Sequence, residues 1–445
     1  MTVWQAVKSV FSQSFWQRAV PVLMVVLSFN VLVQRDWVLK NLPFIHRGQL
    51  GFHRLLCSLA PRPITAKWVR MVEINDDLHQ KLGEPTNRGV LAALVRNAVA
   101  GDATVVVLDF KLISPPPFAD GQDVRERADQ NRALLQAIQD ASDKGVPVVV
   151  PCWLNQTGGR LERRPSIYLD RDLPLADEHG KCAHRACARL GNINLPTDER
   201  QVPLVAPMQA SDPCSESLAL ATATAYDLAF DRVPLTRDKK IIKDAIAKHE
   251  LVFGSFIPED DPPKAKSGPG ANPDSGHTPT GFQTTKAEKL AAVDPADAPG
   301  NAAARAQCRG RIVVIGGKWR SVLGRGELVD RYDTPAGPMT GMYVHANYIE
   351  ALLDDRYQPE VPMWAAIGFD VLIGGALYLS FHRANTRRGK LLVLGVFLVP
   401  LAASYVVFAN LNLYLDFILP LTACFVHLVV EFARDYWRLK SVAAA

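Results

Sequence analysis

Acidic side chains lie directly after two apolar segments of this sequence. Asp76 and Asp77 follow one of them, and Asp109 lies near the end of another. If both segments are strands of an open α/β sheet, the acids lie at its carboxyl edge, where such sheets bind ligands. We therefore predict a ligand or cation site at this edge, with Arg88 as a candidate partner of the acids. The alternative is that the acids cap loops and begin helices, and that Arg88 is a solvated helix residue.

Cysteines are the other residues whose number and spacing carry chemical information. Six of the seven precede the apolar C-terminal region, and Cys424 lies within it. An even number of cysteines in an oxidising compartment predicts disulfides. Cys182 and Cys187 bracket His184. We predict a short disulfide loop there, although the same spacing raises the alternative of a zinc site, and we predict no metal centre.

The sequence lacks the short motifs that mark common catalytic sites. It has no GxxxxGK[ST] phosphate loop, no GxSxG elbow, no HExxH zinc helix and no kinase signature. We therefore predict that the protein is not an enzyme and uses no cofactor; a hydrolase using Asp76, Asp77 and Asp109 is the alternative. The net charge of +5 is spread along the chain, so nucleic-acid binding is not expected.

Strand and helix patterns alternate through the region that holds these residues. Continuous β-branched runs predict buried strands, and apolar residues at helical spacing predict helices. The expected strands cover 69–75, 104–110, 146–153 and 311–317, and the expected helices cover 87–99, 123–142, 217–230 and 341–355. This succession predicts an α/β domain with a parallel or mixed sheet. His345 falls on the last of these helices, whose apolar character indicates a core histidine rather than a ligand.

Residues 259–307 differ in composition from the rest of this region. They are rich in Pro, Gly, Ala, Ser, Asp and Lys and hold hardly any large apolar side chains. Such a stretch cannot bury enough apolar surface to fold, so we predict a disordered insertion within one domain. The alternative is an interdomain linker, which is less favoured because the strand at 311–317 is needed to complete the same sheet.

Four apolar stretches predict an α-helical transmembrane bundle. Residues 361–381, 391–409 and 411–432 each have the length that a helix needs to cross about 30 Å of hydrocarbon. The stretch 19–37 has a shorter apolar core, which would also fit a signal peptide. No small-x-small cleavage site follows it, so we favour an uncleaved anchor.

The loop between the second and third predicted membrane helices sets the orientation. Residues 382–390 contain arginine and lysine but no acid, so the positive-inside rule places them in the cytoplasm. It follows that 38–360 is extracytoplasmic and that both ends of the chain, 1–18 and 433–445, are cytoplasmic. Asp370 lies within 361–381, where an ionisable group is costly. We expect it to face the bundle interior, either to fix packing or to transmit a signal.

Several segments together resemble the CHASE2 domain, an extracytoplasmic sensor domain of bacterial signalling proteins. They are "VEINDD", "LGEPTNRGVLAALVRNAVAGDATVVVLDFKLISP", "GNIN" and "DTPAGPMTGMYVHANYIEALLDD". One helix before the domain and three after it is also the usual layout of that family. The chain departs from the family at "EPTN", where aromatic and proline residues are common, and in its unusual insertion.

The resemblance implies a sensor that passes its signal through the membrane bundle to a cytoplasmic output module. Residues 433–445 are too short for such a module, so we expect a separate cytoplasmic or membrane effector. The leading hypothesis is a multi-pass inner-membrane sensor or signal-relay subunit, for which a homo-oligomer stays open. The alternative is a cell-envelope structural or assembly protein whose ectodomain binds other envelope proteins.

Overall fold

The computed structural model describes the core of the region between residues 65 and 358 and short pieces elsewhere. The described residues are 52, 55–56, 65–82, 87–110, 112, 121–152, 154–157, 160–163, 188–193, 216–230, 252–253, 257, 281–291, 298–319, 330–334, 337–354, 357–358, 368 and 402–407. The chain divides into two compact units, one of Arg62–Tyr357 and one of Met1–Pro61 with Gln358–Ala445. The fold below is that of the unit Arg62–Tyr357.

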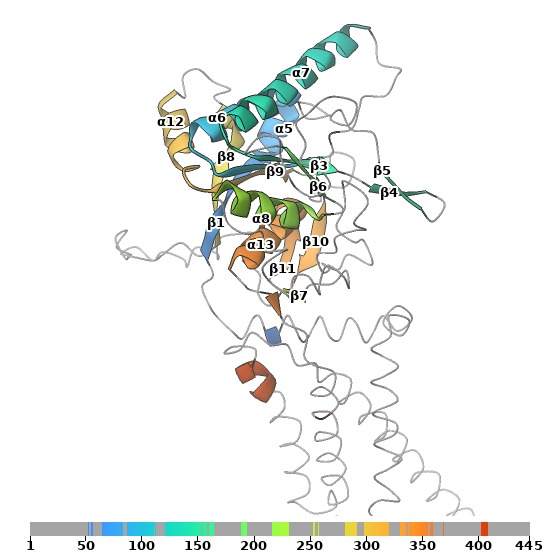
Figure 1. Ribbon diagram of the computed structural model, residues 1–445, viewed down its shortest axis with the longest axis vertical. Helices are drawn as coiled ribbons and strands as arrows, with labels where there is room; N and C mark the ends of the chain where they lie inside the picture. The colour runs from blue at the N-terminus through green and yellow to red at the C-terminus, as the bar shows by residue number, and fades with distance from the viewer. Residues whose placement is uncertain are drawn as a thin grey trace, which may run out of the picture. The chain divides into compact units, whose positions relative to one another are not determined.

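A six-stranded sheet forms the centre of this unit (Figure 1). Its strands, in the order β6-β3-β2-β9-β1-β8 across the sheet, are β6 (Arg189–Asn192), β3 (Val148–Cys152), β2 (Val105–Asp109), β9 (Ile312–Lys318), β1 (Thr65–Asn75) and β8 (Gly281–Lys286). Every pairing is parallel, which confirms the predicted α/β class and selects the parallel form. The central strands are buried because helices cover both faces of the sheet.

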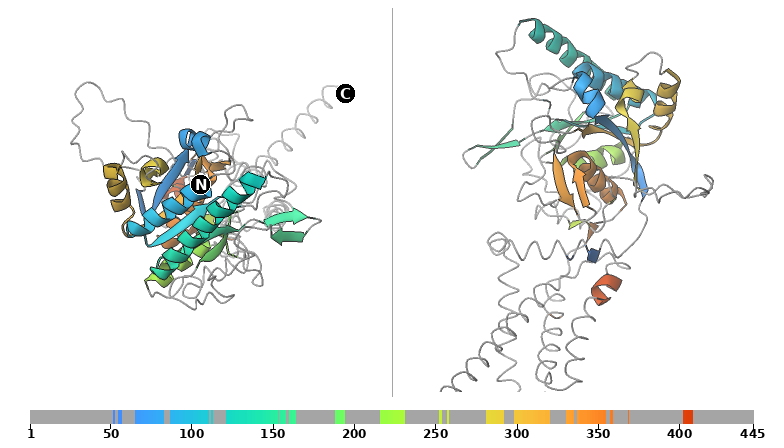
Figure 2. Two further views of the ribbon diagram at one scale, coloured as in Figure 1. Left: turned by 90° about the horizontal axis from the view of Figure 1, so that it is seen from above. Right: turned by 180° about the vertical axis from the view of Figure 1, so that it is seen from behind.

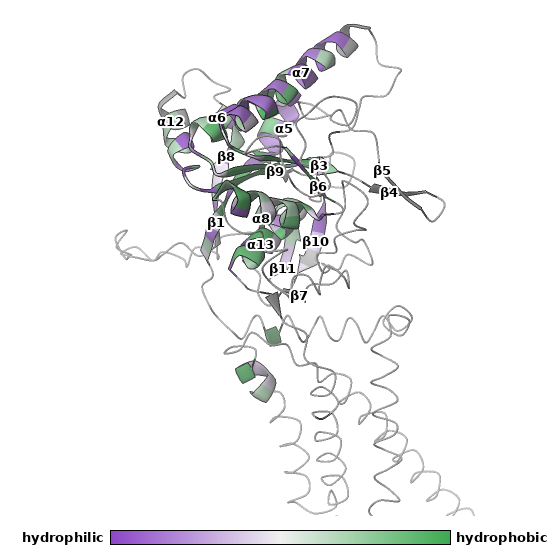
Figure 3. Cartoon of the chain, in the orientation of Figure 1, coloured by the Kyte–Doolittle hydropathy of each residue, from purple (hydrophilic) through white to green (hydrophobic). Residues whose placement is uncertain are grey.

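Helices form a layer on each face of the sheet (Figures 1 and 2). One layer contains α5 (Asp76–Leu82), α6 (Arg88–Ala100), α7 (Gly121–Asp143), α11 (Ala287–Ala291) and α12 (Ala298–Ala306), and the other contains α8 (Leu218–Ala229) and α13 (Gly341–Leu353). Along β1, Val72 and Ile74 join the core under α6, and Val69 and Met71 join the core under α8 and α13. Figure 3 shows that α8 and α13 are largely apolar, whereas α7 carries a polar side away from the sheet.

Local sequence signals explain where the helices begin. The Asn87 side chain accepts hydrogen bonds from the amides of Gly89 and Val90, so it caps α6. Ser217 caps α8 in the same way, through the amide of Leu220. The eight strands and helices that we predicted are all present, with ends shifted by a few residues, as is usual because helix and strand ends fray.

Three short strand pairs lie outside the main sheet. They are β4 (Leu154–Thr157) with β5 (Arg160–Arg163), β10 (Arg331–Thr334) with β11 (Gly337–Thr340), and β7 (Val252–Phe253) with β12 (Tyr357–Gln358). The first two pairs are antiparallel. The β10–β11 pair leads directly into α13, so it fixes where that helix begins.

The prediction of a disordered insertion over 259–307 is wrong for its second half. β8, α11 and α12 lie in it, and β8 pairs with β1 as an edge strand of the main sheet. Arg70 of β1 holds this part of the chain, because its buried guanidinium donates to Gln283, Thr285 and Gln307 and to the carbonyl of Thr284. An edge strand bound in this way needs few large apolar side chains, which is why composition misled the prediction.

Several other predictions concern residues that the structure does not describe. Among the described residues, no helix has both the length and the apolar character to cross a membrane. The four predicted membrane helices lie outside the described residues, except for position 368 and the helical residues 402–407. Cys182, Cys187 and Asp370 also lie outside them.

Candidate functional site

Two carboxylates flank a glycine at the carboxyl edge of the main sheet. Glu73 of β1 and Asp109 of β2 are both in register with Gly316 of β9, the strand between them. Because side chains alternate along a strand, Glu73 and Asp109 point to the face that α13 covers. Two strand spacings separate their Cα atoms by roughly 10 Å. Gly316 of β9 therefore lies between the two acids, on the face of the sheet that α13 covers.

Gly316 allows α13 to lie close to β9. A Cβ atom at this position would lie 2.8 Å from the Cβ of Met342, in the first turn of α13. Real Cβ atoms do not approach each other so closely, so any larger residue would displace the helix. The missing side chain thus brings the start of α13 onto the carboxyl edge, and with it the residues that follow Met342.

Tyr343 and Lys318 surround Glu73. The Tyr343 hydroxyl donates a hydrogen bond to Oε1 of Glu73. The Lys318 ammonium lies 3.6 Å from the same oxygen and 5.3 Å from the centroid of the Tyr343 ring. Glu73 and Lys318 are 19% and 24% exposed, so solvent reaches both. An ammonium placed between a carboxylate and an aromatic face gains from both charge attraction and a cation–π contact.

His345 lies two residues after Tyr343 on α13, with its ring next to Asp109. Its Nε2 is 3.3 Å from the carbonyl oxygen of Ile193 and 4.0 Å from Oδ1 of Asp109. Burial lowers the pKa of His345 to about 4, although the charge of Asp330 and the bond to Ile193 act in the opposite direction. The neutral ring therefore donates from Nε2 at physiological pH. Its Nδ1 is then an acceptor, and within the described part of the chain no donor bonds to it.

Tyr332 and Asp330 complete the Asp109 side of the site. The Tyr332 hydroxyl donates to Oδ1 of Asp330 at 2.6 Å. Burial, followed by the charges of Asp330 and Asp109, raises the pKa of Tyr332, so the phenol stays protonated. Asp330 has a positive φ of 60°, a left-handed conformation that is uncommon for residues other than glycine. Its carbonyl accepts from the amide of Gly341, which joins it to the first residue of α13.

We name these residues the carboxyl-edge cluster: Glu73, Asp109, Lys318, Tyr332, Tyr343 and His345. The chain leaves β2 toward α7 on one face and leaves β9 toward α13 on the other face. Such a change of direction between neighbouring strands is where open α/β sheets bind ligands. The cluster can supply acceptors, an ammonium and hydroxyl groups to a ligand at this place.

The structure divides the predicted site residues between the two faces of the sheet. Asp109 joins the carboxyl-edge cluster. Asp76 and Asp77 lie in the first turn of α5, on the other face, where Asn75 caps the helix through the amide of Leu78. The predicted ligand residues are therefore not gathered in one described network.

Arg88 lies on the same face as α5. It is buried, its backbone amide donates to Gln130 of α7, and its side chain donates to Asn131. These bonds tie α6 to α7.

The cluster also contains residues that sequence reasoning missed. Glu73 ends no strand and lies inside the pattern of β1, so nothing marked it except its place on the same face as Met71. Lys318 comes to Glu73 only because β9 is inserted between β1 and β2. Among the described residues, no three His, Cys, Asp or Glu side chains are grouped to hold a metal ion.

The sequence matches a known protein family. The model of the CHASE2 domain matches residues 21–380, which is most of the chain. The chain belongs to the CHASE2 family. No curated protein and no solved structure matches it. The resemblance predicted from the sequence is thus confirmed, and the CHASE2 domain supports a role in sensing and signal transduction.

The CHASE2 match includes every element that builds the candidate site. It begins before β1 and ends after α13, so the carboxyl-edge cluster belongs to the CHASE2 domain itself. The ordered part of the stretch 259–307 also lies within the match. In this CHASE2 domain, β8 is part of the sheet and not an addition to it.

Proposed function

We propose that this CHASE2 protein is a membrane-anchored sensor that binds a ligand at the carboxyl-edge cluster. The observation that carries the proposal is the Asp109–His345 pair, which brings the end of β2 next to α13, where the chain leaves β2 and β9 toward opposite faces of the sheet. His345 is neutral, and its Nδ1 has hydrogen-bonding capacity that the described residues do not use. Partly exposed Glu73 lies across β9 from Asp109, and Lys318 at the end of β9 lies beside Glu73.

The sensing role extends to a separate effector protein in this proposal. Tyr343 and His345 are both on α13, so a ligand that engages either residue acts on that helix. The sequence after α13 leads toward the predicted membrane helix 361–381. We propose that a signal passes along this connection to a cytoplasmic or membrane partner.

A binding experiment tests the ligand site. Full-length protein in lipid nanodiscs is melted in the presence of three classes of probe: diamines, amino acids and disaccharides. We expect one class to raise the melting temperature, since a ligand at about 100 times its Kd stabilises by about 2.7 kcal/mol. Asp109→Asn and His345→Gln should abolish the shift, and Asp143→Asn at the exposed end of α7 should keep it. A shift that survives both cluster variants would overturn the proposal, as would no shift with any probe.

The proposed topology has its own test. Reporter fusions at Ser267, at Asn385 and at the C-terminus distinguish the two sides of the membrane. We expect an extracytoplasmic signal at Ser267 and cytoplasmic signals at the other two positions. A cytoplasmic signal at Ser267 would contradict both the topology and the proposed disulfide between Cys182 and Cys187.

A further inference from the structure

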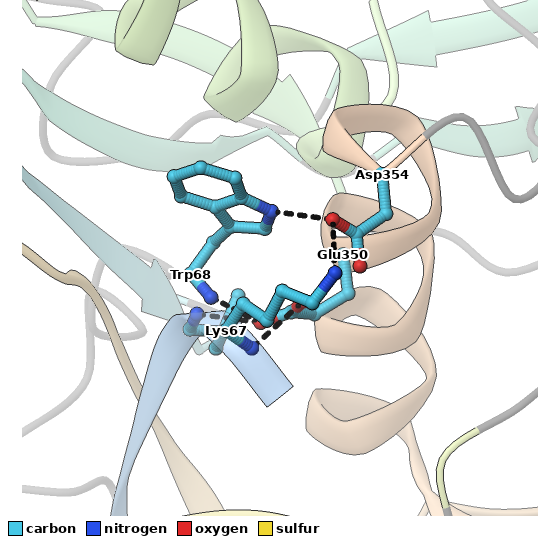
Figure 4. A network of polar contacts seen from close by, with 5 residues as sticks. Lys67, Trp68, Glu350 and Asp354 are labelled. Atoms are coloured by element: carbon cyan, nitrogen blue, oxygen red, sulfur yellow. Dashed lines mark hydrogen bonds and ion pairs between the residues drawn. The ribbon is translucent and has the colours of Figure 1, made fainter. Parts of the chain in front are cut away.

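A buried carboxylate near the end of α13 binds three consecutive backbone amides of β1 (Figure 4). The Glu350 side chain is fully buried. Its Oε1 accepts from the amides of Trp68 and Val69, both at 2.7 Å, and its Oε2 accepts from the amide of Lys67 at 3.2 Å. Successive amides of a regular strand point in opposite directions, so one carboxylate cannot bind three of them. The backbone of β1 must therefore bend around Glu350.

The pairing of β1 with its neighbours shows the same bend. The register between β1 and β8 shifts between Thr65 and Arg70, and pairing with β9 begins only at Val69. Between these points the amides of β1 turn to Glu350 instead of a neighbouring strand. Consecutive backbone amides that turn to one side form a concave site for an anion. In this protein a side chain of α13 fills that site.

Asp354 adds a second set of bonds one helical turn later. It accepts from the indole Nε1 of Trp68 at 3.0 Å and from Nζ of Lys67 at 3.3 Å. We name Glu350, Asp354 and residues Lys67, Trp68 and Val69 the amino-edge clamp. The clamp lies at the opposite end of α13 from Tyr343 and His345, because α13 is 13 residues long and spans roughly 20 Å.

The clamp joins the two ends of the sensor unit. The unit begins at Arg62, shortly before Lys67, and ends at Tyr357, shortly after Asp354. Both chain connections to the rest of the protein therefore leave from the clamp. Between the clamp and the carboxyl-edge cluster, α13 is buried from Gly341 to Leu352. A close-packed helix of this kind moves as one body and transmits displacement.

We propose that the amino-edge clamp is the coupling element of this sensor: it makes α13 and the start of β1 move together when the carboxyl-edge cluster changes. This proposal rests on the sensing function proposed above and deepens it. A displacement of the first turn of α13 is carried along the helix to Glu350. Glu350 then passes it to the backbone of β1, so both connections of the unit respond to one event.

Hydrogen exchange at the amides of Lys67, Trp68 and Val69 tests the coupling without a ligand. The experiment uses the full-length protein and compares these amides with Val106 and Val107 in the centre of β2. Gly316→Ala displaces the first turn of α13 at the far end of the helix. Relative to β2, we expect the three clamp amides to exchange about tenfold faster. Tyr343→Phe is a milder displacement at the same place, should Gly316→Ala fail to fold, and we expect the same direction of change.

A matched variant displaces a different helix on the same face of the sheet. A Cβ atom at Gly191 would lie 2.7 Å from the Cα of Leu218, so Gly191→Ala presses on α8 instead of α13. In this variant we expect the clamp amides to exchange at the same rate, relative to the amides of β2, as in the unaltered protein. If Gly191→Ala accelerates the clamp amides as much as Gly316→Ala does, or if Gly316→Ala leaves them unchanged, the coupling proposal is overturned.

Glu350→Gln tests whether the carboxylate carries the effect. The amide of glutamine cannot accept from Lys67 with its nitrogen, so exchange at Lys67 should rise about ten- to a hundredfold. In this background, Gly316→Ala should have little further effect on the clamp amides. A further effect as large as in the unaltered protein would contradict the role of Glu350. If hydrogen exchange contradicts the coupling, the ligand-induced melting shifts still test the binding site. The coupling proposal can therefore fail while the proposed ligand site stands.

Discussion

The two ends of α13 treat their polar groups differently. At the last turns, Glu350 and Asp354 accept five hydrogen bonds from β1 at 2.7 to 3.3 Å, and Glu350 is fully buried. At the first turns, Glu73 lies 3.6 Å from the ammonium of Lys318, and Asp109 lies 4.0 Å from the neutral ring of His345. His345 also keeps an Nδ1 for which the described residues supply no partner.

This difference indicates that the amino-edge clamp has a structural role and that the carboxyl-edge cluster is a candidate binding site. Buried polar groups in native proteins are nearly always hydrogen-bonded, and groups that depart from this rule concentrate at functional positions. The amino-edge clamp follows the rule, so its bonds serve stability and coupling. The carboxyl-edge cluster departs from it on a helix whose other end is firmly held. The helix can thus present reactive groups without losing its place on the sheet.

Glu350→Ala should have the largest effect, because it would remove the central acceptor of the amino-edge clamp. The variant leaves three backbone amides of β1 without their acceptor, and we expect a loss of about 3 to 5 kcal/mol in the free energy of unfolding. Urea unfolding of the full-length protein, followed by tryptophan fluorescence, measures it. Asp354→Ala is the control, with an expected loss of about 1 kcal/mol. Equal losses in the free energy of unfolding for the two variants would mean that Glu350 does not contribute more than Asp354 to holding α13 on β1.

The pH dependence of the free energy of unfolding should reveal the titration of His345, near the first turn of α13. Its pKa is about 4 in the folded protein and 6.5 in the reference state, so the unfolded chain binds the proton more readily. Stability from the neutral ring is fully present above about pH 6.5 and is lost as the pH falls toward 4. The shift corresponds to about 3 kcal/mol. His345→Gln should remove this part of the pH profile, and an unchanged profile would show that other groups cause it.

Part of this architecture follows directly from the sequence. The strands at β2 and β9 are continuous runs of Val, Ile and Leu, and α6 has both helical spacing and the Asn87 cap, so each could be predicted. β8 could not, because its stability comes from Arg70 and from pairing with β1, which is more than 200 residues away in the chain. Hydropathy reports what a segment buries and not what a distant arginine donates to it.

The candidate site was predictable only in part. Asp109 lies at the end of a clear strand, and sheets of this class bind ligands at such ends. The other members of the cluster are on β1, β9, β10 and α13, and their proximity to Asp109 depends on the order of strands across the sheet, which the sequence pattern does not reveal. His345 was predicted to be a core histidine, and it is buried. The orientation of its ring toward Asp109 required the structure.

Tyr343→Phe should have a smaller effect and would sharpen the comparison. The variant removes the hydroxyl that donates to Glu73, but Lys318 remains beside the carboxylate. We expect a loss of about 0.5 to 1.5 kcal/mol in the free energy of unfolding. Lys318→Met and the double variant complete a cycle that measures how strongly the two residues depend on each other. A loss as large as that of Glu350→Ala would remove the contrast between the two ends of α13.

Cys308 provides a test with the smallest expected effect, on the face of the sheet opposite α13. It is a buried free thiol, and burial raises its pKa to about 11, opposed by the charge of Arg70. At pH 8 it should resist iodoacetamide in the folded protein and react after unfolding, as mass spectrometry can show. Glu350→Ala should leave this protection intact under native conditions. Rapid labelling of Cys308 in the unaltered protein would indicate that α12 and β8 open on their own.

The position of β9 has a consequence for how the protein is made. β1 and β2 are synthesised early, but they do not pair with each other, because β9 fills the place between them. Until residues 312–318 leave the ribosome, both strands have an unpaired edge that could pair with another chain. Sheets with such distant pairings fold slowly, since a long loop must close before the contacts form. A late segment of the CHASE2 domain thus completes the centre of its sheet, and a chain truncated before β9 should aggregate rather than fold into a smaller domain.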